Sequence, residues 1–241
     1  MKITVLGCNG LYPTNAINTS GYLLQTNGKA ILLDVGSGVF NQLKDFVLPE
    51  KIDVIFLSHL HFDHVSDIGV YNYYLEAKAR KGEFNGKIKL FVKNDESAVY
   101  RAIEQLNYFE ICEYNEGEER KIGDLSLNFF KRPHPVLTHG LLVRNNEKTF
   151  VYASDGAMDE KFENAIKEAQ VSLCHTPFTF EKAAQNKAHA SAFEVVKLAS
   201  EHGKRVILSH LLPDTDNGEL LKEIADFDCF EIAKQGRDYQ V

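Results

Sequence analysis

A run of six residues in the first half of the chain carries three histidines and one aspartate. They are His59, His61, Asp63 and His64, and they follow an apolar run at 53–57 that predicts a buried strand. His59 and His61 stand two apart in an extended segment, so both imidazoles point to the same side. Asp63 and His64 then follow a predicted turn. The pattern offers one metal two imidazoles and a second metal an imidazole and a carboxylate, which are ligands that suit zinc.

Elements of two kinds must position this run. Apolar runs of strand length occur at 2–7, 20–26, 29–34, 53–57, 87–92, 125–130, 140–144, 148–153, 170–174 and 204–208. Helical periodicity occurs at 38–47, 67–80, 95–106, 159–168, 188–202 and 217–225. Asp95 and Asp159 are predicted N-caps, and Gly203 a helix end. Early hairpins followed by alternating strands and helices predict an α+β fold of two mixed sheets flanked by helices, with reactive residues on loops at strand ends.

The arrangement His-x-His-x-Asp-His after a hydrophobic strand resembles the signature of the metallo-β-lactamase fold superfamily. The resemblance implies a four-layer αβ/βα sandwich with a dinuclear metal site along one edge. It also implies three further ligands, and residues at the ends of later strands match them: His134, Asp155 and His210. Asp155 would be the carboxylate shared by both metals. The predicted ligand set is therefore His59, His61, Asp63, His64, His134, Asp155 and His210, holding two divalent ions, zinc by ligand type with manganese or iron as alternatives.

Further motifs resemble the phosphodiesterase and RNase Z-like branch of that superfamily. They lie at 7–10, 19–22 and 33–38. In that branch Asp34 would support the metal-binding loop through hydrogen bonds; the alternative is an aspartate that merely ends a strand. His189 is similar to the His-x-Ser/Thr element of phosphodiesterases and would protonate the leaving oxygen, unless it is only a polar residue at a helix start. Asp63 would orient a metal-bridging hydroxide, so Asp63 and His189 are the predicted catalytic residues.

The substrate is expected to be small. The net charge of −7 argues against a large nucleic-acid surface, and the stretch between His64 and His134 lacks the long basic arm that tRNA-maturing relatives carry. We therefore predict a phosphodiesterase acting on a small or cyclic nucleotide-like substrate. A lactone or ester hydrolase of the same fold, or a metal-bound sensing module without catalysis, remains an alternative. His139 and His175 are expected to have non-catalytic roles, at most at the mouth of the pocket.

Composition sets the remaining expectations. The four cysteines show no Cys-x-x-Cys spacing, and the chain passes from Met1-Lys2 directly into a predicted strand. These features predict a cytoplasmic protein without disulfides, signal peptide or membrane span. No linker or repeat interrupts the chain, so we expect one hydrolase domain over 1–241. The resemblance also suggests a homodimer.

Overall fold

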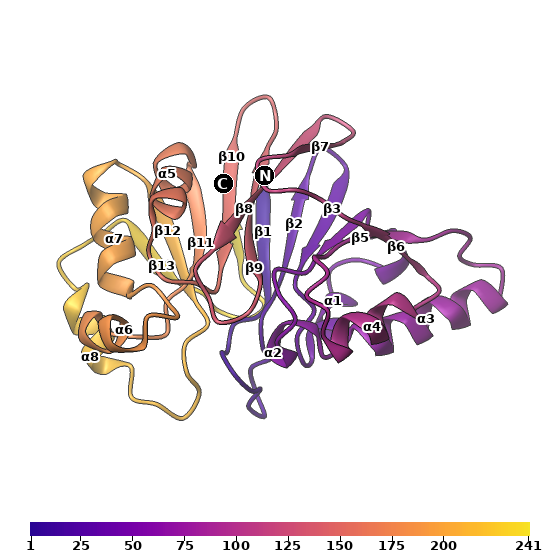
Figure 1. Cartoon of the computed structure of the whole chain (residues 1–241), viewed down its shortest axis with the longest axis horizontal. Helices are drawn as coiled ribbons and strands as arrows, with labels where there is room; N and C mark the ends of the chain where they lie inside the picture. Colours follow the sequence, from indigo (N-terminus) through magenta and orange to yellow (C-terminus); the bar gives the residue numbers. More distant parts are fainter. The chain divides into compact units, whose positions relative to one another are not determined.

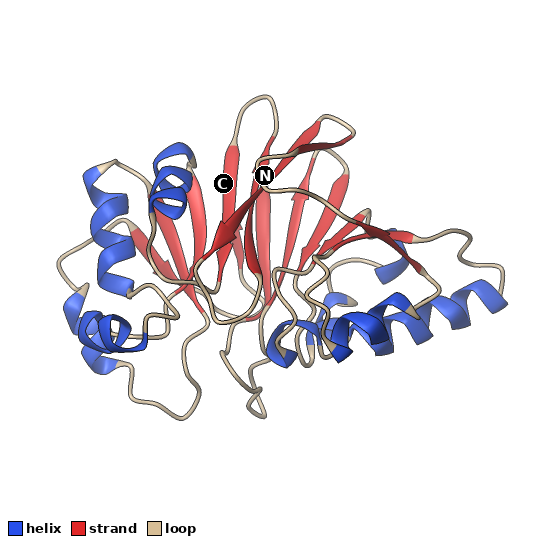
Figure 2. Ribbon diagram, viewed as in Figure 1, coloured by secondary structure: helices blue, strands red, loops and turns tan.

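The computed structural model describes all residues from 1 to 241, and they form two compact units. Unit 1 comprises Met1–Tyr114 and Lys234–Gln240, and unit 2 comprises Asn115–Ala233 with Val241. Each unit holds one seven-stranded mixed sheet with its own helices (Figures 1 and 2). The predicted fold of two mixed sheets with flanking helices is confirmed. A single domain over 1–241 stays a prediction.

The sheet of unit 1 has the strand order β14-β1-β2-β3-β4-β5-β6. Its strands are β1 (Lys2–Gly7), β2 (Gly21–Thr26), β3 (Lys29–Leu33), β4 (Val54–Phe56), β5 (Ile88–Phe91), β6 (Phe109–Cys112) and β14 (Asp238–Gln240). Its helices are α1 (Val39–Leu43), α2 (Phe62–Val65), α3 (Ile68–Arg80) and α4 (Ala98–Glu104), with a 3-10 turn at Pro49–Lys51. Buried aliphatic and aromatic side chains of strands and helices form one core, in which Leu32, Ile55 and Tyr71 are fully enclosed.

The sheet of unit 2 has the order β13-β12-β11-β10-β9-β8-β7. Its strands are β7 (Glu119–Ile122), β8 (Leu125–Arg132), β9 (Thr138–Arg144), β10 (Thr149–Ser154), β11 (Val171–His175), β12 (Arg205–Ser209) and β13 (Phe230–Ile232). Its helices are α5 (Glu160–Glu168), α6 (Phe180–Asn186), α7 (Ala192–Glu201) and α8 (Gly218–Glu223). The core of this unit packs α5 and α7 onto the sheet through residues such as Phe162, Ile166 and Val195.

The two sheets share one pattern of strand direction. In unit 1 the four strands from β14 to β3 pair antiparallel and the four from β3 to β6 pair parallel. In unit 2 the four strands from β7 to β10 pair antiparallel and the four from β10 to β13 pair parallel, so β3 and β10 occupy the same place in the two patterns. The carboxyl ends of parallel strands meet at one edge of a sheet, where loops carry ligand-binding residues. The run at 59–64 follows the parallel strand β4, and Asp155 and His210 follow the parallel strands β10 and β12. His134 instead follows the antiparallel strand β8, and His189 follows helix α6.

All four strands that the sequence pattern missed lie at sheet edges. β6 and β14 flank the sheet of unit 1, and β7 and β13 flank that of unit 2. Side chains in these strands are mostly exposed or half-buried, because one side of an edge strand has no neighbour. The mostly acidic stretch from 113 to 121 therefore ends in a strand, β7.

Helix ends required smaller corrections. Asp95 is not the N-cap of α4: its carboxylate accepts a hydrogen bond from the backbone of Ser97, and Ser97 caps the helix. α7 begins at Ala192 rather than 188, because Ser191 and Glu194 form a capping box there. Asp159 caps α5 as predicted. None of the helices combines the length and apolar character that crossing a membrane requires.

Candidate metal centre

The first cluster of metal-ligating side chains lies in unit 1, between β4 and the start of α3. His59 Nε2 and His61 Nδ1 face each other at 3.0 Å, and the extended backbone of His61 places both rings on one side, as predicted. Two nitrogens bonded to one ion at about 2.0–2.1 Å stand roughly 3 Å apart, so this pair fits a shared metal. His64 Nε2 lies 3.6 Å from Asp63 Oδ2. The turn predicted after His61 is the first turn of a short helix, α2.

Asp34 orients the histidines of this cluster from behind. Its carboxylate is fully buried and accepts hydrogen bonds from His64 Nδ1 at 2.6 Å, Ser58 N at 2.7 Å and Ser58 Oγ at 2.8 Å. Ser58 Oγ also contacts His59 Nδ1 at 3.0 Å. A proton held on Nδ1 leaves Nε2 of His64 unprotonated, which is the form that binds metal. Of the two alternatives for Asp34, the structure supports the hydrogen-bonding one.

The backbone of Leu11 holds the carboxylate of Asp63. Leu11 N donates to Asp63 Oδ2 at 2.9 Å, although the two residues lie far apart in the sequence. Leu11 adopts a left-handed φ of 62°, while its side chain is 63% exposed. A strained conformation of this kind costs about 1–3 kcal/mol and persists only where its surroundings impose it. The contact fixes one oxygen of Asp63.

Gly36 brings the loop after β3 against the motif. A Cβ at this position would lie 2.2 Å from the carbonyl oxygen of Asp63 and 2.3 Å from Thr19 Oγ1. The same loop bonds to α2 and the residues after it through the backbone: Val35 N donates to His64 O and Asp67 N to Val35 O. The glycine at 36 thus allows a close approach of the two backbone segments.

The second cluster lies in unit 2 and converges on Asp155. The histidine nitrogens around its carboxylate are His175 Nδ1 at 2.7 Å, His210 Nε2 at 3.6 Å, His134 Nε2 at 3.8 Å and His189 Nε2 at 4.0 Å. Asp155, His175 and His210 each offer a ligand atom within 4.8 Å of the others. Four imidazoles around one buried carboxylate are a donor set of the kind that binds divalent transition metals.

Strand ends and strained residues aim these side chains. Asp155 follows β10, His175 ends β11 and His210 follows β12, which are neighbouring parallel strands. Ser154 and His210 have left-handed φ values of 54° and 63°. Such conformations cluster at functional sites, where the surrounding structure imposes them. His134 is oriented instead by a hydrogen-bonding contact of 2.9 Å between its Nδ1 and the carbonyl oxygen of Ala188.

The sequence predicted that His175 lies at most at the mouth of the pocket, but in the structure this residue is part of the cluster. It is fully buried, contacts Asp155, and stacks on His210 with ring centroids 4.6 Å apart. A signal was available, because His175 ends a strand in the same way as Asp155 and His210 follow theirs. His139, by contrast, lies within β9 opposite Lys131 and does not follow a strand end.

A basic pocket of about 360 Å³ opens beside His134 in unit 2. Its lining includes Lys131, Arg132, Asp159 and Lys161. Lys161 pairs with Glu116, and Arg132 is almost completely buried. Burial lowers the pKa of the Arg132 guanidinium to about 10, so this side chain remains cationic at neutral pH. The charged lining favours an anionic group.

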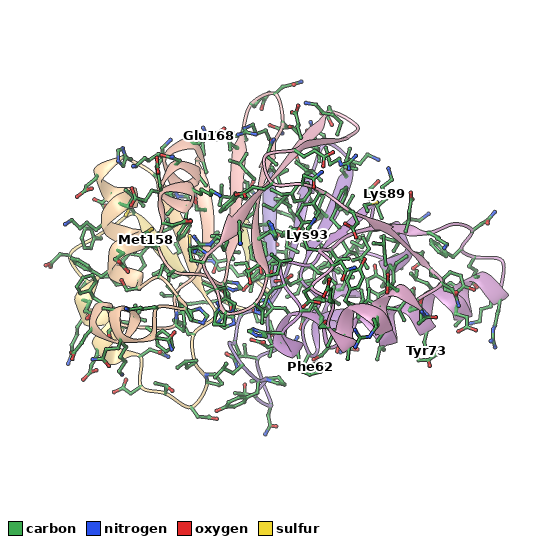
Figure 3. The ribbon with its side chains drawn as sticks, in the orientation of Figure 1. Phe62, Tyr73, Lys89, Lys93, Met158 and Glu168 are labelled. Atoms are coloured by element: carbon green, nitrogen blue, oxygen red, sulfur yellow. The ribbon has the colours of Figure 1, made fainter.

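Apolar side chains are exposed beside the motif in unit 1. Phe62 and Tyr73 are 71% and 72% exposed and point away from α2 and α3 (Figure 3). A pocket of about 220 Å³ between α2, α3 and α4 has an apolar lining that includes Phe62, Val99 and Leu106. Tyr71, by contrast, is fully buried, so the tyrosines of α3 divide between core and surface.

Comparisons with known proteins agree with this chemistry. The chain is 27% identical over 212 residues to the "Probable metallo-hydrolase YhfI" of Bacillus subtilis (strain 168), covering 88% of this chain and 87% of that protein. The crystal structure of the metallo-beta-lactamase fold protein YhfI superposes with a TM-score of 0.89 over 99% of this chain and 98% of that one. Human tRNase Z, short form, has a TM-score of 0.77 at 16% identity, covering 100% and 99%, and shows the fold alone. The protein is a metallo-hydrolase of the metallo-β-lactamase fold. The model of the family described as "Anti-Pycsar protein Apyc1" matches residues 1–235.

Proposed function

The chain belongs to the anti-Pycsar protein Apyc1 family, and from this membership and the two His/Asp clusters we propose that it is a dinuclear metal-dependent phosphodiesterase that opens cyclic nucleotides. The observation that carries the proposal is the convergence of four histidines on the Asp155 carboxylate, one of which, His189, is more exposed than the others. The reaction adds water to phosphorus and breaks one P–O bond of the cyclic phosphate. The ring oxygen leaves as a hydroxyl.

The two clusters would hold two divalent ions. The residues that would hold them are the seven predicted ligands: His59, His61, Asp63, His64, His134, Asp155 and His210. When bound, two such ions lower the pKa of water and stabilise negative charge on phosphoryl oxygens. His175 would hold Asp155 in place through Nδ1, as Asp34 holds His64. Zinc suits this donor set, and cellular availability of manganese or iron also decides which metal is loaded.

Asp63 would orient the attacking water and accept its proton. Its Oδ2 is held by Leu11 N at 2.9 Å, which limits rotation of the carboxylate. A base held in one orientation reduces the ordering cost of the reaction.

His189 would donate a proton to the leaving oxygen. Its side chain is 12% exposed, whereas those of His134, His175 and His210 are at most 3% exposed, so a substrate can reach it. The leaving group of a cyclic nucleotide is an alkoxide, which departs poorly without a proton. The backbone of Ala190, next to His189, donates to Gly156 O at 2.8 Å and fixes this segment beside Asp155.

The basic pocket beside His134 supports an anionic substrate. Lys131 and Lys161 lie in its lining next to a proposed metal ligand. Positive charge at this place attracts a phosphodiester and does not favour a neutral lactone.

Metal analysis of the purified protein and a panel of substrates test the proposal. We expect about two metal ions per chain and turnover of cyclic nucleotides, with weaker or no turnover of lactones and thioesters. Asp63→Ala should abolish phosphodiester hydrolysis. Fewer than about two metals per chain, or hydrolysis that survives Asp63→Ala, would contradict the mechanism.

The role of His189 is tested by the leaving group. His189→Ala should reduce kcat for a cyclic nucleotide by roughly a hundred- to ten-thousand-fold. The loss should be much smaller for a bis-aryl phosphate, whose leaving group departs without a proton. His202→Ala, an exposed histidine at the end of α7, is the matched control and should have no effect. Equal losses on both substrates would refute the acid role, and lactone turnover unaffected by His189→Ala would favour a lactonase.

A further inference from the structure

The loops that carry His134, Asp155 and His189 are tied together by backbone contacts inside unit 2. Ala190 N donates to Gly156 O at 2.8 Å, and Ala157 N donates to Pro133 O at 2.9 Å. His134 Nδ1 lies 2.9 Å from Ala188 O. These bonds join residues that lie beside or near His134, Asp155 and His189 in the sequence, so they link the three loops to one another. Their relative placement sets the geometry around Asp155.

One side chain stands at the centre of these links. Arg132 Nη2 donates to Gly156 O at 2.7 Å, so the carbonyl next to Asp155 accepts both this bond and the one from Ala190. The guanidinium lies 3.7 Å from the centroid of the Phe162 ring. Gly156 has a φ of 143°, and a Cβ there would lie 2.8 Å from Arg132 Cβ and 3.0 Å from its Nε. Arginine and glycine therefore fit each other closely.

The positive charge of Arg132 is buried but has few hydrogen bonds and no carboxylate within hydrogen-bonding distance to offset it. Its side chain is fully buried, yet Nε and Nη1 have no hydrogen-bond partner within the protein. The nearest carboxylate oxygen is that of Asp159, 3.7 Å from Nη1 and on a residue that is partly exposed. A charge in such surroundings lowers the stability of a fold, and an apolar side chain of similar size often replaces it without loss. A role of the guanidinium in the metal site would explain why an arginine occupies this buried position.

We propose that Arg132 is a positioning residue that clamps the Asp155-Gly156 loop and thereby sets the metal-binding geometry of Asp155 and His134. The inference rests on the ligand roles proposed above for these two residues. Arg132 acts through the carbonyl of Gly156 and through its own place in the chain, two residues before His134. Phe162 keeps the plane of the guanidinium in a fixed orientation.

Replacing Arg132 should weaken metal binding without reducing the stability of the metal-free protein. In Arg132→Met the carbonyl of Gly156 keeps its bond from Ala190, and Asp159 keeps its capping bond to Phe162 N, so no buried partner loses its only bond. We therefore expect the metal-free variant to unfold at the same or a higher urea concentration than the wild type. Affinity for Zn²⁺ should fall by roughly 10–100-fold, as for other residues that orient metal ligands.

The experiment measures Zn²⁺ affinity by competition with a chromophoric chelator and urea unfolding of the metal-free protein, on the full chain. Arg144→Met is the matched control, because Arg144 pairs with Glu168 at the end of α5 and contacts no proposed metal ligand, and should leave Zn²⁺ affinity unchanged. Arg132→Lys retains a cationic donor but loses the planar group that stacks on Phe162, and should bind several-fold more weakly than the wild type.

The outcomes separate this inference from the proposed function. Failure of the wild type to bind Zn²⁺ would refute the metal site itself. Binding within threefold of wild type in Arg132→Met, or a loss of affinity matched by an equal loss of unfolding free energy, would overturn the clamp. If Arg132→Met does not fold, Arg132→Lys decides: wild-type affinity in that variant overturns the proposal, and a several-fold loss with an unchanged unfolding midpoint supports it.

Discussion

Replacing Asp34 by asparagine tests how far the proposed metal site depends on residues that do not touch the metal. Asp34 accepts three hydrogen bonds, one from His64 Nδ1 and two from Ser58. Alanine would remove the acceptor of Ser58 N and His64 Nδ1, at about 1–3 kcal/mol each, or about 2–6 kcal/mol in total, while Ser58 Oγ keeps its contact with His59 Nδ1. A domain is stable by only about 5–15 kcal/mol, so Asp34→Ala is expected to fold poorly. Asparagine is therefore the informative change.

In Asp34→Asn the amide oxygen can still accept from Ser58 N. The NH₂ group replaces Oδ2, which lies 2.6 Å from His64 Nδ1, and presents a donor where the imidazole also donates. His64 relieves this by moving its proton to Nε2, the nitrogen that should bind metal. We expect Zn²⁺ affinity to fall 10–100-fold, or about 1.4–2.8 kcal/mol. The lost charge-assisted bond should reduce the unfolding free energy by about 1.5–3 kcal/mol.

Competition with a chromophoric chelator measures the affinity, and urea unfolding in EDTA measures the stability. Asp53→Asn is the matched control: Asp53 precedes the same strand β4, and its carboxylate accepts from Lys29 Nζ and Ala30 N instead of from a histidine. That variant should lose stability without losing Zn²⁺ affinity. If Asp34→Asn binds Zn²⁺ within threefold of the wild type, the tautomer argument is wrong.

Three other predictions follow from the described contacts. His175→Ala should lower Zn²⁺ affinity roughly 10–100-fold, because the carboxylate of Asp155 loses a hydrogen bond of 2.7 Å; unchanged metal content after dialysis would show that His175 is dispensable. Gly36→Ala should destabilise the protein by about 1–3 kcal/mol, since its Cβ would lie 2.2 Å from Asp63 O. Gly69→Ala in α3 meets no atom within 4 Å and should stabilise the protein by up to about 1 kcal/mol. Urea unfolding that ranks the two variants in reverse would contradict the packing argument. Burial raises the pKa of the Cys174 thiol from 9.0 to about 12, so its contribution to stability is complete below pH 9 and is lost as the pH rises toward 12. The unfolding free energy of Cys174→Ala should therefore depend less on pH than that of the wild type between pH 9 and 11. Identical pH dependence in the two proteins would refute the raised pKa of Cys174.

Much of the site could be predicted because its residues sit in local patterns. The run at 59–64 needs only a preceding strand and extended backbone to bring His59 and His61 to one side, and both are properties of neighbouring residues. Asp155 and His210 stand directly after apolar runs, where a strand must end. Strand β12 and helix α5 were also within reach, since hydrophobic periodicity and an N-capping aspartate are local signals.

The edge strands and the residues that support the site could not be predicted from such local patterns. β7 and β13 have few buried side chains, and only a neighbouring strand on one side makes them strands at all. Leu11 contributes to the site through its backbone N–H, which every residue other than proline possesses, so its side chain carries no signal. Arg132 in the sequence is an ordinary arginine. Only burial against Gly156 and Phe162 distinguishes it.

The cluster at 59–64 thus shows where the division falls. By itself the sequence predicted which residues could bind metal and where along the chain they stand, because ligand type and strand ends are local chemistry. Tertiary structure alone decided that Asp34 orients His64 and that Leu11 holds Asp63. Those bonds join residues that are 30 and 52 positions apart. Which distant groups meet is set by the packing of the whole sheet and its loops, and no spacing between neighbouring residues encodes it.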